Sequence, residues 1–241
     1  MTAAGAVPVL FGRMPGRAMR DLSLGFAAGV MLAASFFSLI LPALDAAAED
    51  FSGAVPAAIV CAGILLGMGG VHLMNELLPH EHFRSGREGP EGASLRRIWL
   101  FVIAITIHNF PEGLAVGVGF GAKGFEGGLP LAMGIGLQNM PEGLAVAVAL
   151  LGEGYPRRRA FLIAALTGMV EPIGGVLGAG VIVVSEPLLP WGLAFAAGAM
   201  LYVISHEIIP ETHRAGHQNL ATTGLAVGLV VMLFLDVWLG V

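Results

Sequence analysis

Long runs of apolar residues alternate with short polar connections along most of this chain. Runs long enough for a helix of about 20 residues to cross a bilayer lie at 21–45, 54–79, 98–121, 127–152, 158–184, 188–210 and 220–241. Polar residues do not recur at every second position within them, as they would in the strands of a membrane β-barrel. Since backbone polar groups in lipid need internal partners, the runs are predicted to be seven transmembrane α-helices.

The segment 1–11 is also apolar, but it is too short to cross a membrane. As a helix it would reach about 16 Å, roughly half of the hydrocarbon layer. Arginines follow this segment, whereas a secretory signal peptide carries its basic residues first. We therefore expect it to be the end of a truncated helix rather than a signal peptide.

Composition agrees with a membrane protein. Of the 241 residues, 56% are hydrophobic and 12% are charged, against roughly 25% charged residues in soluble domains. The predicted fold class is an all-α integral membrane protein, a polytopic helical bundle that forms a single transmembrane domain over 1–241. The longest polar connection, 81–97, is expected to be a cytoplasmic loop. With one cysteine, Cys61, the chain can form neither an internal disulfide nor a thiolate metal cluster.

Basic residues fall on alternate connections, which predicts the orientation in the membrane. Except for Lys123, all twelve lie before the first run, between 81 and 97, at 157–159 or after the sixth run. That side is expected to be cytoplasmic, which places the C-terminus outside. No further basic patch exists, so a nucleic-acid partner is not expected.

Glycines four residues apart recur in several runs, as in Gly25/Gly29, Gly63/Gly67 and Gly174/Gly178. Such spacings let helices approach closely. Tight packing within the bundle and a subunit interface are both compatible with this pattern.

Two similar polar motifs interrupt neighbouring runs. "HNFPEGLAVGVGF" covers 108–120 and "QNMPEGLAVAVAL" covers 138–150. Because consecutive runs cross the membrane in opposite directions, the copies would be related by a pseudo-two-fold axis in the membrane plane, where many transporters bind substrate. An ionisable side chain at this depth costs at least about 2.5 to 3.5 kcal/mol, so it is by default paired or functional.

Three glutamates, Glu112, Glu142 and Glu171, fall near the middle of consecutive runs, each beside a proline. Pro172 is expected to free the carbonyl of Gly168 from its helical partner, and a cation is one group that can satisfy a freed carbonyl in lipid. A kinked helix with a buried His/Glu network would explain one such motif, but three adjacent ones favour a metal site. The candidate ligands are His108, Asn109, Glu112, Gln138, Asn139, Glu142 and Glu171.

The candidate ligands combine one imidazole with carboxylate and amide oxygens and no thiolate. His108 and Glu112 are four residues apart, as are Gln138 and Glu142, so each pair shares a helix face. Such a donor set suits Zn²⁺, Cd²⁺, Fe²⁺, Mn²⁺ or Co²⁺ and argues against Cu⁺.

The stretches "HNFPEGLAVGVGF", "QNMPEGLAVAVAL" and "MVEPIGG" resemble the fourth, fifth and sixth transmembrane helices of the ZIP (Zrt-, Irt-like protein) family of metal transporters, most of all its bacterial members. The resemblance covers nearly the whole chain if 1–11 is the remnant of the first of eight helices. It implies uptake toward the cytosol across a bacterial inner membrane, a homodimer, and an elevator-like motion of helices one, four, five and six against the other four.

The resemblance also implies a binuclear metal site. One metal position would be formed by His108, Glu112, Gln138 and Glu142. The second would be formed by Asn109, Asn139 and Glu171 together with the bridging glutamates. Many ZIP proteins have His in place of Gln138, and some have Asp in place of Asn139.

Polar residues away from the midplane are candidates for a metal pathway. One group, His72, Glu76 and His80, is spaced i, i+4, i+8 near the cytoplasmic end of 54–79, where an exit relay and snorkelling toward water are both compatible with the spacing. A second group, His206 and Glu207, lies near the cytoplasmic end of 188–210 and favours an exit path. Asp236, a carboxylate in the outer half of 220–241, favours an entrance that raises the local cation concentration.

Secondary transport of a divalent metal is the function that this pattern favours, with Zn²⁺ as the first candidate. Zn²⁺ or Cd²⁺ is expected as transported substrate, and no cofactor is expected. No "GxxxxGK[ST]" phosphate-binding loop occurs in the sequence. The alternatives are an intramembrane metalloenzyme, a metal-gated receptor without flux, and an unrelated efflux carrier. An enzyme is disfavoured because "HEIIPETH" places its second His too far along the helix for the "HExxH" pattern.

Overall fold

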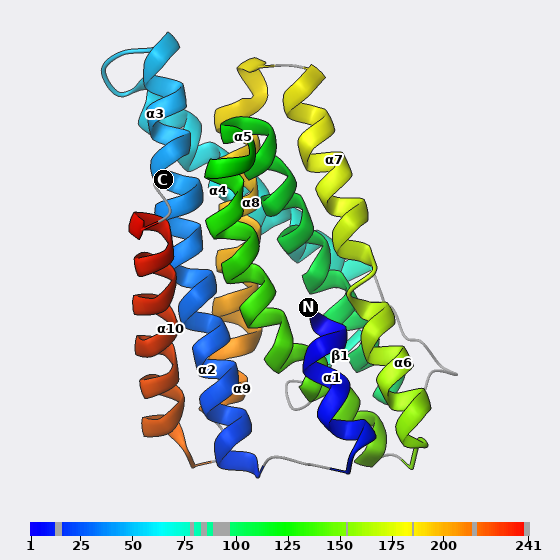
Figure 1. Ribbon diagram of the computed structural model, residues 1–241. Coiled ribbons are helices and arrows are strands. Elements are labelled where there is room, and N and C mark those ends of the chain that lie inside the picture. The colour runs from blue at the N-terminus through cyan, green and yellow to red at the C-terminus, as the bar shows by residue number, and fades with distance from the viewer. Residues whose placement is uncertain are drawn as a thin grey trace.

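The computed structural model describes residues 1–12, 16–77, 80–82, 86–88, 97–152, 154–184, 186–213 and 216–238. Within these ranges the chain is a bundle of helices (Figure 1), and six segments are long and apolar enough to cross a membrane. A small antiparallel hairpin of β1 (His80–His82) and β2 (Gly86–Glu88) lies at one end. The predicted all-α polytopic membrane fold is confirmed.

Most helices follow one another with few connecting residues, and the longest connection joins α4 to α5. In chain order they are α1 (Thr2–Leu10), α2 (Arg17–Ala33), the π-helix η1 (Ala34–Ile40), α3 (Leu41–Asp50), α4 (Val55–Leu77), α5 (Arg97–Gly152), α6 (Arg157–Thr167), α7 (Val170–Val184), the 3₁₀-helix η2 (Glu186–Leu188), α8 (Leu189–Val203), the π-helix η3 (Ile204–Ile208), α9 (Ile209–Thr212) and α10 (Gln218–Trp238).

The predicted runs 98–121 and 127–152 are joined more tightly than expected. Both belong to α5, whose helical backbone is interrupted at Gly124 with φ 67° and ψ −161°. This backbone conformation is open to glycine at no steric cost, so the chain reverses there. We call 97–123 the first limb of α5 and 125–152 the second limb. The first limb is helical, although it is not among the six membrane-length segments.

The predicted run 158–184 contains one membrane-length segment, Arg157–Gly180, but its helix is interrupted, because α6 ends at Thr167 and α7 begins at Val170. Pro172 has no N–H to donate to the carbonyl of Gly168. The chain instead makes two tighter bonds, from Met169 N to Leu166 O at 3.0 Å and from Glu171 N to Gly168 O at 3.3 Å. The break places Glu171 in the first turn of a new helix.

Glycines bring helices of this one chain into backbone contact. A Cβ on Gly25 would collide with the carbonyl of Ala221 in α10, and a Cβ on Gly224 would collide with that of Leu22 in α2. A Cβ on Gly113, in the first limb of α5, would likewise collide with the carbonyl of Glu171 in α7. The small-residue spacings therefore serve packing within the bundle.

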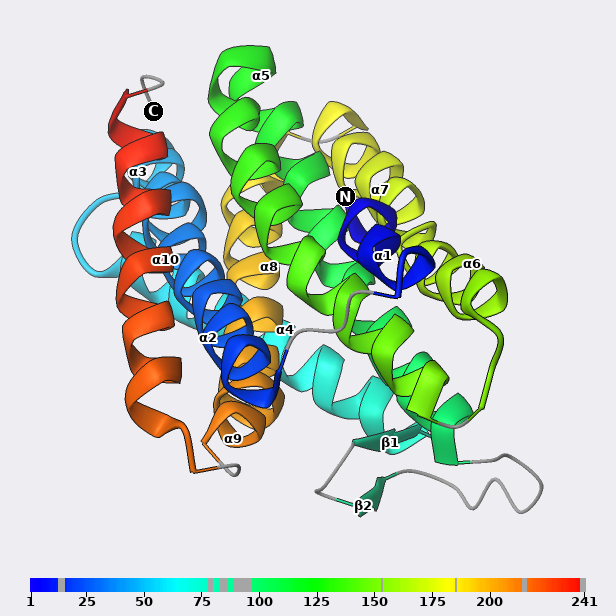
Figure 2. The same cartoon turned by 60° about the horizontal axis from the view of Figure 1, so that its bottom comes forward.

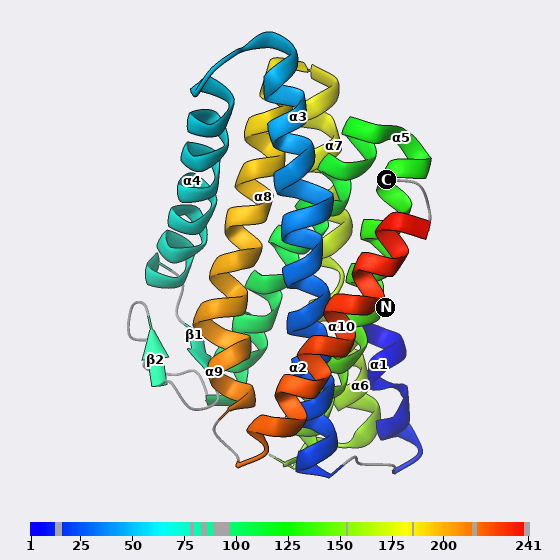
Figure 3. The same ribbon diagram turned by 90° about the vertical axis from the view of Figure 1, so that its left-hand side faces the viewer.

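The apolar interior forms two clusters. One includes Met31, Leu193, Met200 and Met232 and lies among α2, α8 and α10, which stand together with α4 in Figure 3. The other joins α1, α6 and parts of both limbs of α5, and Figure 2 shows α1 on that side of the molecule, away from α10.

The ends of the bundle follow the predicted alternation of connections. Figure 1 shows the end of α1 and the starts of α2, α6 and α10 at one end, and the α3–α4 connection, the bend of α5 and the end of α7 at the other. The first end carries the arginines of α2 and α6, such as Arg17 and Arg158.

Candidate metal centre

The two copies of the repeated motif lie inside the bundle, one on each limb of α5. Asn109 and Glu112 are on the first limb, and Gln138, Asn139 and Glu142 are on the second. All five side chains are buried, with Glu142 the most exposed at 4%. Polar side chains so deeply buried need partners or a ligand.

A hydrogen bond joins the two limbs directly. The side-chain Nε2 of Gln138 donates to Oε1 of Glu112, and it also donates to Oδ1 of Asn139 at 3.1 Å. The second limb therefore orients the carboxylate of the first. The predicted pairing of the two motifs across an axis between the limbs agrees with this contact.

The break between α6 and α7 provides a further partner. Asn109 Nδ2 donates to the backbone carbonyl of Thr167 at 3.0 Å. In a continuous helix Glu171 N would take this carbonyl, but it bonds to Gly168 O instead. The freed carbonyl is therefore that of Thr167, and the expectation of a freed Gly168 carbonyl is wrong by one residue.

Glu171 reaches the same site from the first turn of α7. Its Oε1 accepts a hydrogen bond from the hydroxyl of Thr2 at 3.0 Å, and Asn139 lies beside it. Glu112 interacts electrostatically with both Glu142 and Glu171. Three carboxylates in one buried region repel one another unless a cation or protons compensate their charge.

Sequence reasoning missed Thr2 and Thr167. Both are buried, at 1% and 3% exposure. Thr2 carries the one polar side chain of segment 1–11, and that isolation in an apolar stretch was the available signal. Thr167 contributes its backbone carbonyl, which side-chain patterns do not reveal.

Several buried oxygens of the site accept no hydrogen bond from the part of the chain that the structure describes. They are Asn109 Oδ1, Glu112 Oε2 and Gln138 Oε1. Buried acceptors without donors are rare in proteins, and amide and carboxylate oxygens are ligands for divalent cations. The chemistry of these oxygens therefore fits a metal ion.

The imidazole of His108 falls outside the described side chains, although its backbone is helical in the first limb. Among the described residues no group of three or more His, Cys, Asp or Glu side chains is arranged to hold a metal. Glu112 instead accepts a hydrogen bond from the amide of Gln138. The role of His108 as a ligand stays a prediction.

The predicted stripe of His72, Glu76 and His80 does not form on one helix. α4 ends at Leu77, and His80 belongs to β1. The i+8 position is therefore lost from the stripe, and Glu76 is exposed on α4.

Tyr202 lies between His72 and His206, another predicted exit residue. The Nδ1 of His72 lies 3.3 Å from the hydroxyl of Tyr202 in α8. The ring of Tyr202 stacks on His206 in η3, with centroids 5.0 Å apart. The side chain of Glu207 falls outside the described residues, so its place in an exit path stays a prediction.

Asp236, the predicted entrance carboxylate, is buried between α10 and η1. It is 4% exposed, and the Ser38 hydroxyl lies 2.9 and 3.0 Å from its two carboxylate oxygens. This position agrees with a carboxylate deep in the last span, and its role in an entrance path stays a prediction.

Comparison with known proteins identifies the family. Residues 78–236 match the model of the family described as ZIP Zinc transporter. The chain is 49% identical to "Zinc transporter GufA" of Myxococcus xanthus over 99% of this chain and 94% of that protein. It is 48% identical to "Zinc transporter ZIPB" of Bordetella bronchiseptica over 99% and 78% of the two chains, and 40% identical to "Zinc transporter ZIP11" of Homo sapiens over 100% and 94%.

The chain thus belongs to the ZIP zinc transporter family. The family predicted from the paired motifs is confirmed, and so is the predicted class, a multi-pass membrane protein of a transporter family rather than an enzyme.

Proposed function

We propose that this protein carries divalent transition-metal ions across the membrane through the buried site between the two limbs of α5. One observation carries the proposal: Asn109, Glu112 and Gln138 hold buried oxygens to which no described group donates, next to Glu142 and Glu171. Zinc is the first substrate because the named relatives are zinc transporters. The oxygen-rich donor set also suits Cd²⁺, Fe²⁺ and Mn²⁺.

The proposed site is binuclear. One position uses His108, Glu112, Gln138 and Glu142, and the other uses Asn109, Asn139 and Glu171 with the bridging glutamates. The bond from Gln138 to Glu112 and the proximity of Glu112 to the other two glutamates support this division. Divalent cations would compensate the negative charge of the three clustered carboxylates.

The test is zinc and cadmium influx into proteoliposomes that contain the purified full-length chain and a trapped metal indicator. Glu112→Ala and Glu142→Ala should abolish saturable influx, because each removes a carboxylate from the site. Glu126→Ala is the matched control, since Glu126 is exposed near the bend of α5, and it should transport at the wild-type rate. Wild-type influx in both site variants would contradict the proposal, and metal binding without influx would indicate a receptor.

We also propose uptake into the cytosol across a bacterial inner membrane, with the C-terminus outside. The arginine-rich end of the bundle supports this orientation. A Cys61→Ala chain offers a cysteine-free background in which to place one cysteine at Glu126 or at Arg158. A membrane-impermeant thiol reagent added to intact spheroplasts should label position 126 and not position 158, and the reverse would overturn the orientation.

An elevator-type motion and a homodimer complete the proposal. The separate apolar cluster of α1, α5 and α6 supports a body that moves against the remaining helices. Single cysteines along the second limb of α5 should change accessibility from one membrane side to the other when zinc is added; unchanged labelling would count against the motion. Light scattering of the detergent-purified protein should give the mass of two chains.

A further inference from the structure

We propose that Thr2 is a positioning residue for Glu171: its hydroxyl fixes one carboxylate oxygen so that the other stays available to the metal. This inference rests on the proposed function, since it assigns Glu171 to a metal site. Thr2 itself is not proposed as a ligand. It acts through the hydrogen bond from its Oγ1 to Glu171 Oε1 at 3.0 Å.

The direction of the Thr2 hydroxyl sets it apart from most hydroxyls in the described helices. Ser35 bonds back to the carbonyl of Met31, and Thr106 bonds back to that of Val102, four residues earlier in the same helix. Thr2 instead crosses from α1 to α7, to a residue 169 positions away in the sequence. Thr2 is only 1% exposed, so its hydroxyl is shielded from water and depends on the carboxylate of Glu171 as its hydrogen-bond acceptor.

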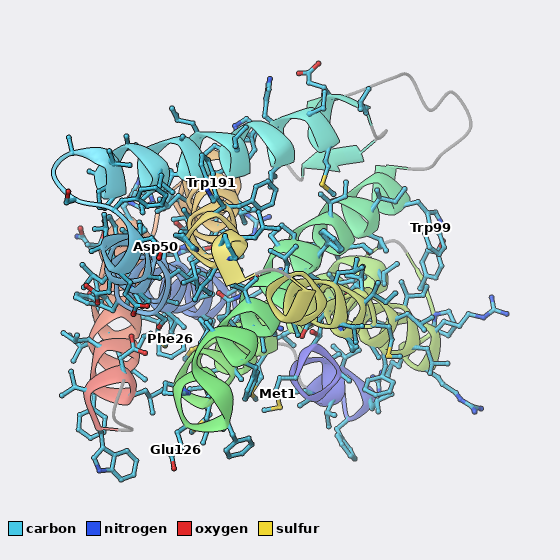
Figure 4. All side chains as sticks on the ribbon, turned by 90° about the horizontal axis from the view of Figure 1, so that it is seen from above. Met1, Phe26, Asp50, Trp99, Glu126 and Trp191 are labelled. Carbon is cyan, nitrogen blue, oxygen red and sulfur yellow. The ribbon has the colours of Figure 1, made fainter. Side chains whose placement is uncertain are left out.

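Backbone contacts hold Thr2 in place. A Cβ on Gly143, in the second limb of α5, would collide with the carbonyl of Thr2, and a Cβ on Gly5 would collide with the carbonyl of Met140. The start of α1 therefore rests directly on the backbone that carries the second motif. Figure 4 looks down the bundle and shows Met1 beside α5, in agreement with the 3.0 Å that would separate a Cβ on Gly136 from Met1 Cγ.

Gly168, in the break between α6 and α7, leaves room for both partners. A Cβ there would lie 2.6 Å from Thr2 Oγ1 and 3.1 Å from Glu171 Oε1. The first distance is too short for any stable contact, so a side chain at this position would displace the hydroxyl from the carboxylate. The break thus turns Glu171 toward the site and also admits the group that orients it.

A donor on one carboxylate oxygen has a defined effect on metal binding. It restricts rotation of the Glu171 carboxylate and uses a lone pair on Oε1, which favours binding through a single oxygen. Loss of such an outer hydrogen bond typically lowers metal affinity about 10- to 100-fold, because the ligand must be ordered when the metal binds.

The experiment compares Thr2→Val, which keeps the shape of the side chain but not the donor, with Thr2→Ser, which keeps the donor. Both are made in the full-length chain. Zinc influx into proteoliposomes gives KM and maximal rate, titration calorimetry of the detergent-purified protein gives the Kd for zinc, and thermal unfolding reports on folding. Thr2→Val should raise both KM and Kd about tenfold with little change in maximal rate or unfolding temperature, and Thr2→Ser should stay near wild type.

The outcomes separate this inference from the proposed function. If Glu142→Ala abolishes influx while Thr2→Val matches wild type in KM and Kd, the positioning role is overturned and the transport function stands. Equal losses in Thr2→Val and Thr2→Ser would assign Thr2 to packing and also overturn the role. If wild-type influx does not depend on Glu142, the proposed function fails, and the Kd comparison alone then decides whether Thr2 orients a zinc ligand.

Discussion

The side-chain amide of Asn109 meets the backbone carbonyl of Thr167 at 3.0 Å, across the break between α6 and α7. This contact fixes the orientation of the amide group of Asn109. The nitrogen faces the broken helix, and the buried Oδ1 is left without a donor among the described residues. The side chain of Asn109 thus donates to the carbonyl that the break frees, and its oxygen remains available to the proposed metal site.

Asn109→Ala should therefore affect both stability and transport. The Thr167 carbonyl loses its donor, which should cost about 1 to 3 kcal/mol of unfolding free energy, and zinc influx should fall at least about tenfold because a ligand oxygen is lost. Thermal unfolding and proteoliposome influx check the two effects. Thr106→Val is the control, because the Thr106 hydroxyl bonds only to the Val102 carbonyl of its own helix in the described contacts. Wild-type influx in Asn109→Ala would remove Asn109 from the proposed site.

Gly113→Ala should separate the first limb of α5 from α7. Its Cβ would collide with the backbone carbonyl of Glu171, so α7 must shift and carry Glu171 with it. We expect a loss of about 1 to 3 kcal/mol of stability, as for overpacked cores, together with a strong loss of influx.

The control for Gly113→Ala is Gly69→Ala in α4. A Cβ on Gly69 would meet nothing within 4 Å, so this change should be neutral or should stabilise the helix by up to about 1 kcal/mol. Equal unfolding temperatures for the two alanine variants would show that the close approach of α5 and α7 is not tight in the folded protein.

Gly124 is constrained by its backbone rather than by its neighbours. Its φ is 67°, and a Cβ there would meet nothing within 4 Å. Gly124→Ala should cost about 1 to 3 kcal/mol from backbone strain alone, because the combination of φ 67° and ψ −161° is essentially restricted to glycine. Gly124→Asn should cost about as much, since the positive-φ region that Asn tolerates has a different ψ, and Gly124→Val should cost most because a β-branched residue tolerates positive φ least. Unfolding temperatures in any other order would contradict this backbone conformation at Gly124.

Zinc influx should fall as the pH is lowered from about 8 to about 5, because protons compete with the metal for imidazole and carboxylate ligands. The pH must be equal on both sides of the vesicle membrane so that no proton gradient contributes. His108→Asn should change this profile, since it removes the imidazole from the groups for which protons and zinc compete. An unchanged profile in this variant would argue against His108 as a ligand.

Local sequence patterns were sufficient to predict most of the helices and one contact between the two motifs. The i, i+4 spacing and the repeated motif indicate that Glu112 and Gln138 face a common region, and the structure joins their side chains. Pro172 indicates a weak point in its helix, and the chain breaks near it, between Thr167 and Val170. These features depend on residues within about one or two turns of each other, which is the range over which helical periodicity acts.

Contacts between distant helices could not be predicted in the same way. Thr2 and Glu171 are 169 residues apart, and Ser38 and Asp236 are 198 apart, so no spacing rule connects them. Which carbonyl is freed at the break also depends on tertiary packing. The N–H of Glu171 bonds to the carbonyl three residues earlier, that of Gly168, rather than to the carbonyl of Thr167 four residues earlier. Both require the packing of several helices to be known first.

The single-residue reversal at Gly124 has a mechanical consequence for any ion held between the limbs of α5. Because one glycine joins the two limbs, they cannot move far apart at that end. In the proposed elevator motion Glu112 and Glu142 would therefore move together. An ion bound between the limbs would leave from the end away from Gly124, where the limbs are not joined to each other.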